Sequence, residues 1–260
     1  MAHPTGDELA LLKAVASRPD DDLPRLVYAD WLDEHGRGER AEFIRLQVAH
    51  EQPMTGSERA TVRERMNALL NDHRAEWFRE LPRWVRQWYT SRWDERPDYR
   101  RGFVEEVSVV ASHFLRFGGQ LLDRTPVVSL SLCHLGGVRS HLARCPWLGR
   151  VPNLDLTWGH LEEEGAAALA RNRHLRGVRT LDLYGCALGD AGVRVLADAT
   201  SLTGLTKLDL RSNDLTLAAV KALRGARFLR TLTELNLARN PQLLGHEDRI
   251  RQWFDGRAVL

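Results

Sequence analysis

The triplet Leu-Asp-Leu recurs in this chain at an unvarying interval of 27 residues. It occupies positions 154–156, 181–183 and 208–210, and Leu235-Asn236-Leu237 follows after the same step. Self-similarity at a fixed period of about 20 to 50 residues is typical of a solenoid, in which stacked units bury one another's apolar faces. The second half of the chain is therefore expected to be a repeat array, an architecture that usually supplies a binding surface rather than a catalytic pocket.

The repeated unit follows the pattern L-x-x-L-x-L-x-x-N/C-x-L. Four clear units and two weaker upstream ones begin at Val151, Val178, Leu205, Leu232, Val104 and Val127. Alternation in each L-x-L core places leucines on one face of a short strand and polar residues on the other. Between the strands, stretches such as 189–197 carry Val193, Leu196 and Ala197 at helical spacing.

This pattern resembles the leucine-rich repeats of the ribonuclease-inhibitor-like class. The resemblance implies an α/β fold, a leucine-rich-repeat solenoid of short parallel strands backed by helices. The positions of Asn213 and Asn240 require side chains that form hydrogen bonds with the backbone where the chain turns. Cys186 stands at the equivalent place one unit earlier, so we interpret it as structural rather than reactive.

The residues between the leucines form columns on the face of the predicted sheet. One column holds three aspartates, and aromatic and basic residues stand beside it: Asp155, Asp182, Asp209, Trp158, Tyr184, Arg211 and Arg239. Aromatic residues and arginine dominate binding hot spots, so these residues are predicted to bind a partner. For the aspartates we favour the alternative that they only solvate the sheet, whereas for Trp158 and Tyr184 we favour binding.

Residues 1 to about 80 lack the repeat and are expected to be all-helical, with helices from about Thr5 to Ser17, 25–35, 40–48 and 57–80. The words Pro-Arg-Leu-Val-Tyr-Ala-Asp-Trp-Leu-Asp-Glu (24–34) and Ala-Glu-Phe-Ile-Arg-Leu-Gln (41–47) resemble the bacterial repeat-companion domain, a helical module found next to repeat arrays. Residues 101–105, Arg-Gly-Phe-Val-Glu, resemble the start of the array in such proteins. The resemblance implies architecture and no activity.

The first helices also place Asp30, Asp33 and Glu34 on one helical face, an arrangement compatible with a hard cation. We favour the alternative of ion pairs with Arg25 or Arg45, because no second helix offers matching ligands. No metal and no cofactor are therefore predicted.

The segment from 77 to 101 is rich in aromatic and basic residues. Trp77, Leu81, Trp84 and Trp88 fall on one helical stripe that only Pro82 interrupts. Basic residues between aromatic ones can bind single-stranded nucleic acid, here through Arg83, Arg86, Trp88, Arg92 and Trp93. We favour a cap that seals the first strand of the array.

The expected organisation is thus a helical module at 1–80, a junction and cap at 81–101, an array of about six units at 102–245 and a C-terminal cap at 246–260. In the last segment, 248–256 is expected to be a short helix with Ile250, Trp253 and Phe254 on one side, and 258–260 a final strand.

Composition excludes several functional classes. The net charge of +2 is too small to indicate nucleic-acid or membrane binding by itself. No leader peptide or membrane-spanning run is expected, and three cysteines at unpatterned spacings indicate a reduced, cytoplasmic protein. Motifs for phosphate loops, nucleophile elbows and zinc sites are absent from the sequence.

The sequence therefore predicts a non-enzymatic bacterial scaffold or adaptor that binds a protein partner. The alternatives are nucleic-acid binding through the junction, which we consider the weaker hypothesis, and an accessory subunit of a bacterial enzyme complex. It predicts neither the partner nor the oligomeric state.

Overall fold

A computed structural model of the chain describes residues 5–91 and 97–260. By its contacts the chain divides into two compact units. The helical unit consists of Met1–Val107 and Gly119–Val128, and the repeat array consists of Ser108–Gly118 and Ser129–Leu260. The domain boundaries expected from composition and motifs stay predictions, because a division by contacts is a different criterion.

The helical unit is built largely from helices, and side-chain caps fix the starts of α1 (Gly6–Ser17) and α4 (Gly56–Trp77). Thr5 accepts a hydrogen bond from the backbone N–H of Glu8, and Thr55 forms a reciprocal capping box with Glu58. None of the described helices is long and apolar enough to cross a membrane. The elements are α1 (Gly6–Ser17), α2 (Leu23–Glu34), α3 (Gly38–His50), α4 (Gly56–Trp77), the 3₁₀ helix η1 (Phe78–Glu80) and α5 (Arg83–Thr90).

Only the first half of the aromatic stripe expected at the junction is buried, namely Trp77 and Leu81. The chain leaves α4 at Trp77, and Pro82 caps the start of α5, so the helical phase is reset between them. In α5 the buried residues are Val85 and Tyr89, whereas Trp84 and Trp88 are half-buried. The stripe thus ends at Pro82, where the sequence placed its interruption, because a proline between two helices breaks the helical periodicity.

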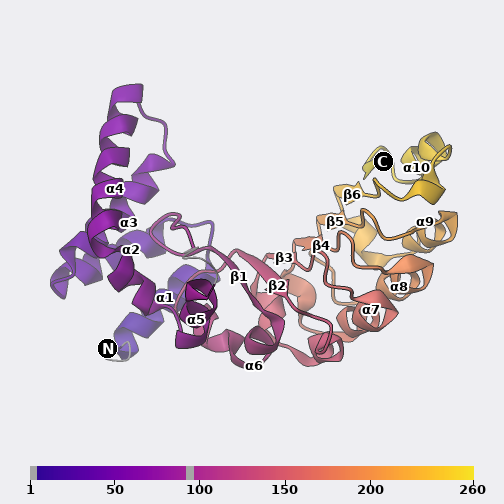
Figure 1. The fold of residues 1–260 in the computed structure, drawn as a ribbon. Helices are drawn as coiled ribbons and strands as arrows, with labels where there is room; N and C mark the ends of the chain where they lie inside the picture. The colour runs from indigo at the N-terminus through magenta and orange to yellow at the C-terminus, as the bar shows by residue number, and fades with distance from the viewer. Residues whose placement is uncertain (1–4, 92–96) are drawn as a thin grey trace. The chain divides into compact units, whose positions relative to one another are not determined.

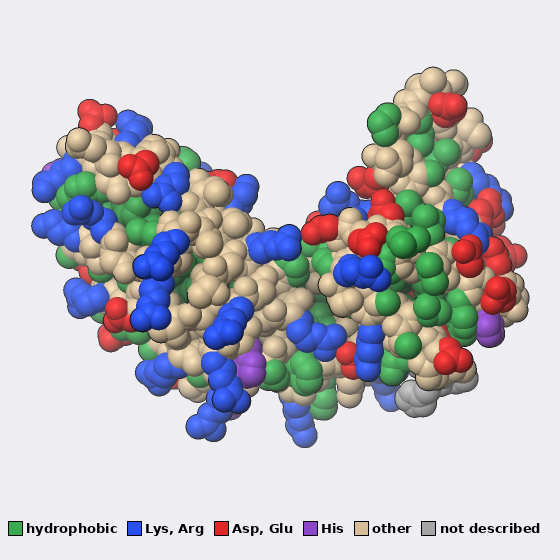
Figure 2. All heavy atoms as spheres, turned by 180° about the vertical axis from the view of Figure 1, so that it is seen from behind, with side chains coloured by type: hydrophobic (Ala, Val, Ile, Leu, Met, Phe, Trp, Pro, Cys, Tyr) green, Lys and Arg blue, Asp and Glu red, His purple; other side chains and the backbone are tan. Residues whose placement is uncertain are grey.

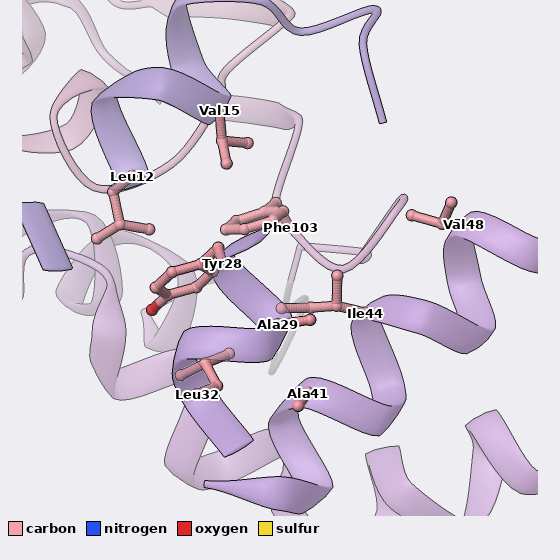
Figure 3. Packing of buried hydrophobic residues seen from close by; sticks show 9 residues of the cluster. All are labelled: Leu12, Val15, Tyr28, Ala29, Leu32, Ala41, Ile44, Val48 and Phe103. Carbon is pink, nitrogen blue, oxygen red and sulfur yellow. The ribbon is translucent and has the colours of Figure 1, made fainter. Parts of the chain in front are cut away.

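The core of the helical unit joins three helices to a segment that follows them much later in the chain. Phe103 packs among side chains of α1, α2 and α3, and its ring centroid lies 5.8 Å from that of Tyr28 (Figure 3). The nine residues of this cluster are Leu12, Val15, Tyr28, Ala29, Leu32, Ala41, Ile44, Val48 and Phe103.

Residues of α3 hold the segment before the first strand in place. The side-chain amide of Gln47 donates to the carbonyl of Tyr99 at 3.0 Å, and its oxygen accepts from the backbone N–H of Gly102 at 2.7 Å. Gly102 has a φ of +87°, and a Cβ there would lie 2.9 Å from Cα of Ile44, so only glycine fits. Segments 41–47 and 101–105, each singled out in the sequence by a resemblance, therefore contact each other.

A buried ion pair anchors the same segment. Arg25 of α2 and Glu105 are almost completely buried, and the Arg25 guanidinium donates a hydrogen bond to the Glu105 carboxylate. Burial lowers the pKa of Arg25, and the Glu105 carboxylate opposes that shift. Of the two arginines expected to pair with Asp30 and Asp33, Arg45 makes the ion pairs and reaches each carboxylate at 2.6 Å.

The repeat array alternates short strands with helices. The described strands form one sheet in sequence order, β1-β2-β3-β4-β5-β6-β7. Strands β2 to β7 are paired in parallel. The strands are β1 (Glu106–Val110), β2 (Ser129–Cys133), β3 (Asn153–Asp155), β4 (Thr180–Asp182), β5 (Lys207–Asp209), β6 (Glu234–Asn236) and β7 (Ala258–Val259).

Helices and 3₁₀ turns fill the segments between these strands. Within the array, β3 to β6 line the inner side of an arc, and α7 to α10 lie along its outer side (Figure 1). The helices and 3₁₀ turns between the strands are α6 (Ala111–Leu122), η2 (Arg139–Arg144), η3 (Trp147–Arg150), α7 (Glu162–Arg171), η4 (Leu175–Gly177), α8 (Gly189–Ala197), α9 (Leu217–Leu223), η5 (Arg227–Arg230), η6 (Pro241–Leu243) and α10 (Glu247–Trp253).

The 27-residue period fixes the register of the sheet. Leu154 pairs with Leu181, Leu181 with Leu208, and Leu208 with Leu235. These leucines are at most 1% exposed, and so are the second leucines of each triplet. Each L-x-L core therefore points both leucines into the array and leaves the residue between them on the other face.

Buried asparagines join successive turns, as the sequence predicts. The Asn213 side chain donates to the carbonyl of Leu183 at 2.8 Å and accepts from the backbone N–H of Leu188 at 3.1 Å. Asn240 makes the equivalent bond to Leu210 at 3.1 Å. Cys186 occupies the equivalent position one unit before Asn213, and its thiol donates to the carbonyl of Leu156 at 3.1 Å. Burial raises the pKa of Cys186 to about 12, which suits a structural thiol.

The last segment has the predicted elements. Helix α10 buries Ile250, Phe254 follows it into the core, and Trp253 is half-buried. Strand β7 pairs with β6 through Leu235 and Ala258, as expected for the final strand.

Candidate protein-binding surface

The aspartate column lies where each strand ends. Asp155, Asp182 and Asp209 pair in register across β3, β4 and β5 and are half-buried. In each, Oδ1 accepts a hydrogen bond of 2.8 to 2.9 Å from the backbone N–H two residues later. Asn236 makes the same bond in the next unit at 3.2 Å. One oxygen of each aspartate is therefore used to turn the chain out of the strand.

The electrostatic environment differs along this column. Asp182 is the middle member, and its pKa is raised chiefly by burial and further by the charges of Asp209 and Asp155. The hydrogen bond from the Tyr184 N–H opposes that rise. Asp209 is instead paired with Arg211, whose Nε and Nη2 both lie 2.7 Å from Oδ2. Two of the predicted site residues thus neutralise each other.

The next turn of each unit bends sharply. His134, Trp158, Gly185, Ser212 and Arg239 occupy equivalent positions, and all five have φ between 50° and 64°. The backbone N–H of Trp158 donates to the carbonyl of Tyr184, and that of Gly185 donates to Arg211, so hydrogen bonding between units continues through the turn. Because of this shared backbone conformation, the Trp158 and Arg239 side chains are exposed at equivalent positions of their units.

Four of the predicted binding residues meet around one tyrosine. We call Trp158, Tyr184, Arg211 and Arg239 the Tyr184 cluster. The Trp158 and Tyr184 ring centroids are 4.8 Å apart, and the Arg211 and Arg239 guanidinium carbons lie 4.8 Å and 5.8 Å from the Tyr184 ring centroid. The Arg239 guanidinium also donates to the Tyr184 hydroxyl at 2.8 Å.

Exposure within the cluster is uneven. Trp158 is 59% exposed, which is unusual for so large an apolar side chain, whereas Tyr184 is half-buried beneath its neighbours. Of the two aromatic residues for which the sequence favours binding, Trp158 is therefore the more accessible. A fixed aromatic surface flanked by two guanidinium groups can bury apolar groups of a partner and donate hydrogen bonds to its acceptors.

The predicted nucleic-acid residues are placed only in part. Arg83, Arg86 and Trp88 lie on α5, with Arg83 exposed and Trp88 half-buried. Arg92 and Trp93 lie outside the described residues. Figure 2 shows Lys and Arg side chains spread over one face, with Asp and Glu side chains among them.

The predicted face of Asp30 and Asp33 is occupied by its ion pairs with Arg45. Within the described ranges 5–91 and 97–260, no group of three or more histidine, cysteine or carboxylate side chains is placed to hold a metal ion.

Sequence reasoning missed a cavity in the helical unit. Arginines line it, among them Arg37, Arg40 and Arg124. The sequence offered one clue, because Arg40 falls at the start of an otherwise apolar helical face. Its burial became visible only in the structure, where it is 3% exposed.

Comparison with known proteins identifies the repeats. The leucine-rich-repeat family model matches residues 171–197 and 202–223, which contain β4, α8, β5 and α9. The chain therefore contains leucine-rich repeats, a motif that commonly mediates binding between proteins. No curated protein and no solved structure matches it.

Proposed function

We propose that this chain is a non-enzymatic adaptor whose array is a leucine-rich-repeat solenoid that binds a protein partner on its strand-lined face. The Tyr184 cluster carries this proposal. It presents an exposed tryptophan beside a tyrosine and two arginines, the residue types that dominate hot spots between proteins.

The cluster is also organised before any partner binds. Tyr184 is held by Arg239 through a hydrogen bond and by Arg211 through its ring, and Arg211 is held by Asp209. Fixed side chains lose less conformational freedom on binding, so more of the contact energy contributes to affinity.

The chemistry of the array supports binding rather than catalysis. The aspartates of the column accept hydrogen bonds from the backbone where the chain turns. Burial raises the pKa of the Cys145 and Cys186 thiols, which disfavours the reactive thiolate. We further propose that the helical unit is a bacterial repeat-companion module and that the protein acts in the cytoplasm. The words 24–34 and 41–47 support the first proposal, and the three free cysteines support the second.

The test is an affinity capture with matched variants. Wild type, Trp158→Ala/Tyr184→Ala and Trp147→Ala would each be immobilised and incubated with lysate of the source organism. Trp147 is a half-buried tryptophan of η3, outside the strands, whose ring lies 5.9 Å from the Arg150 guanidinium carbon. The adaptor proposal predicts a protein that wild type and Trp147→Ala recover and the double variant loses.

Two other outcomes would contradict it. Equal recovery by all three proteins would remove the cluster from the binding site. Recovery of nucleic acid that falls steeply as salt rises would instead support the junction hypothesis, because phosphate contacts release counterions.

A further inference from the structure

The helical unit contains a cavity of about 870 Å³. Its walls come from α1 to α5 and from Gln120 and Arg124, and all of these belong to the same compact unit. Leu12, Leu81 and Pro82 supply apolar wall. Pockets for small molecules typically measure about 300 to 1,000 Å³ and combine apolar walls with a few converging polar groups. The size therefore fits a small ligand.

Part of the charge in these walls is neutralised internally. Glu8 accepts from Arg37 at 2.6 Å and from the Tyr28 hydroxyl at 2.9 Å. The Glu80 carboxylate is shared by Arg37 at 3.3 Å and by Arg40 at 3.2 Å. These two glutamates thus balance Arg37 and Arg40.

Other arginines of the walls lack such partners. Among the described residues, no hydrogen bond or ion pair engages the side chains of Arg79, Arg83, Arg86 and Arg124. The remaining lining carboxylates, Glu39 and Glu76, are both exposed. Six arginines thus line the cavity beside four glutamates, so the cavity carries an excess of positive charge.

Arg40 adds a buried charge at the same place. Its side chain is 4% exposed, and its Nε and Nη1 have no hydrogen-bond partner in the described part of the chain. Its guanidinium carbon lies 4.9 Å from the Trp77 ring centroid. The ring centroids of Phe43, Tyr99 and Phe103 lie 5.5 to 5.9 Å from the same carbon. Aromatic faces and Glu80 thus stabilise the buried charge, and negative charge in the cavity would stabilise it further.

We propose that this cavity is a binding site for a small phosphorylated molecule. Guanidinium groups match phosphate oxygens in a forked geometry and are more weakly hydrated than ammonium groups. A phosphate brings three acceptor oxygens and nearly two negative charges, enough for several of the unpaired arginines. The site is separate from the Tyr184 cluster, so it would give the adaptor a second ligand.

The test is calorimetric titration of the full chain at low salt. The probes are inorganic phosphate, adenosine monophosphate, adenosine and succinate. Saturable binding of adenosine monophosphate without binding of adenosine is expected, because recognition depends on the phosphate. Comparable affinity for inorganic phosphate would identify the free ion as the ligand; tighter binding of the ester would identify a phosphorylated molecule.

Matched arginine variants locate the site. Arg83→Gln and Arg124→Gln should each weaken binding about tenfold, the scale of one lost charge-assisted hydrogen bond. Arg63→Gln is the control, because Arg63 is exposed on α4 and does not line the cavity. Arg83 is itself exposed, so its replacement should leave the fold intact, which circular dichroism would check.

Three results would overturn the proposal. One is the absence of saturable binding by any phosphate probe at millimolar concentration. Another is adenosine or succinate binding as tightly as adenosine monophosphate. The third is an equal loss of affinity in Arg63→Gln, which would show diffuse attraction to surface charge.

Discussion

The guanidinium of Arg239 donates a hydrogen bond of 2.8 Å to the hydroxyl of Tyr184, although the two residues follow strands that are separated by a third. The Arg239 side chain thus spans the unit of Arg211, and both arginines contact the same ring. With Trp158, which contacts the other side of the cluster, residues of four successive units are joined in one surface. This explains how a repeat array can present a fixed site without a pocket.

Tyr184→Phe tests how far this cluster contributes to folding. The substitution keeps the ring against Trp158 and Arg211 and removes only the acceptor for Arg239. Since that hydrogen bond is exposed, the free energy of unfolding should fall by less than about 1 kcal/mol. Urea denaturation measures it, and a loss of 3 kcal/mol or more would show that the cluster is a folding element.

Gly185→Ala should displace the exposed tryptophan. Gly185 has a φ of +64°, and a Cβ there would lie 2.4 Å from Cε3 of Trp158. Gly189→Ala is the matched control, since Gly189 has a φ of +56° and no atom within 4 Å of that position. The free energy of unfolding should fall by about 1–2 kcal/mol in both variants, because alanine is strained in the left-handed backbone conformation.

Of these two variants, only Gly185→Ala should displace the Trp158 ring. With 5-fluorotryptophan incorporated, the fluorine resonance assigned through Trp158→Phe is expected to shift in this variant alone. An unchanged resonance would contradict the close contact between Gly185 and Trp158.

Asp182→Asn should stabilise the array at neutral pH. Because the folded state raises the pKa of Asp182, it binds more protons than the unfolded chain between the two pKa values. The free energy of unfolding therefore decreases as pH rises through that window, which begins near the unfolded value of about 3.9.

Asparagine keeps the acceptor for the Tyr184 N–H and removes the charge, as Asn236 shows two units later. We expect a gain of about 0.2–1 kcal/mol at pH 7, the scale of charge effects between adjacent strands, and almost none at pH 3. Asp209→Asn is the control, since it loses the pair with Arg211 and should not stabilise. A loss of stability in Asp182→Asn at pH 7 would refute the account.

Glu105→Gln should destabilise the helical unit strongly. It leaves the Arg25 charge buried without its counter-ion, a change that typically costs about 3–5 kcal/mol. The exposed pair of Asp33 with Arg45 provides the comparison, and Asp33→Asn should cost at most about 1 kcal/mol. Similar losses in the two variants, measured by urea denaturation, would argue against an anchoring role for Glu105.

The sequence predicted features that depend on local period. Leu154, Leu181 and Leu208 fall in register because the interval is constant, and residues 189–197 form a helix with the expected bounds. The alignment of the three aspartates in one column follows from the same constant interval of 27 residues. Its role in turning the chain did not, because the bond from Asp182 to the Tyr184 N–H depends on the conformation after the strand.

Features that join distant segments were beyond prediction. The contact of Arg239 with Tyr184 crosses one unit and depends on a long side chain whose direction the period does not fix. The cavity collects Arg37, Arg83 and Arg124 from separate elements. At α5 the sequence located the break at Pro82 but not the new buried face, since the helix that starts after Pro82 buries Val85 rather than Trp84.

The most direct test of the adaptor account is the affinity of the captured partner for Trp158→Ala, measured by interferometry beside wild type and Trp147→Ala. A hot-spot tryptophan contributes about 2 kcal/mol or more, so the dissociation constant should rise at least about 30-fold for Trp158→Ala and remain unchanged for Trp147→Ala. An unchanged constant for Trp158→Ala would show that the partner binds elsewhere and would contradict the central claim.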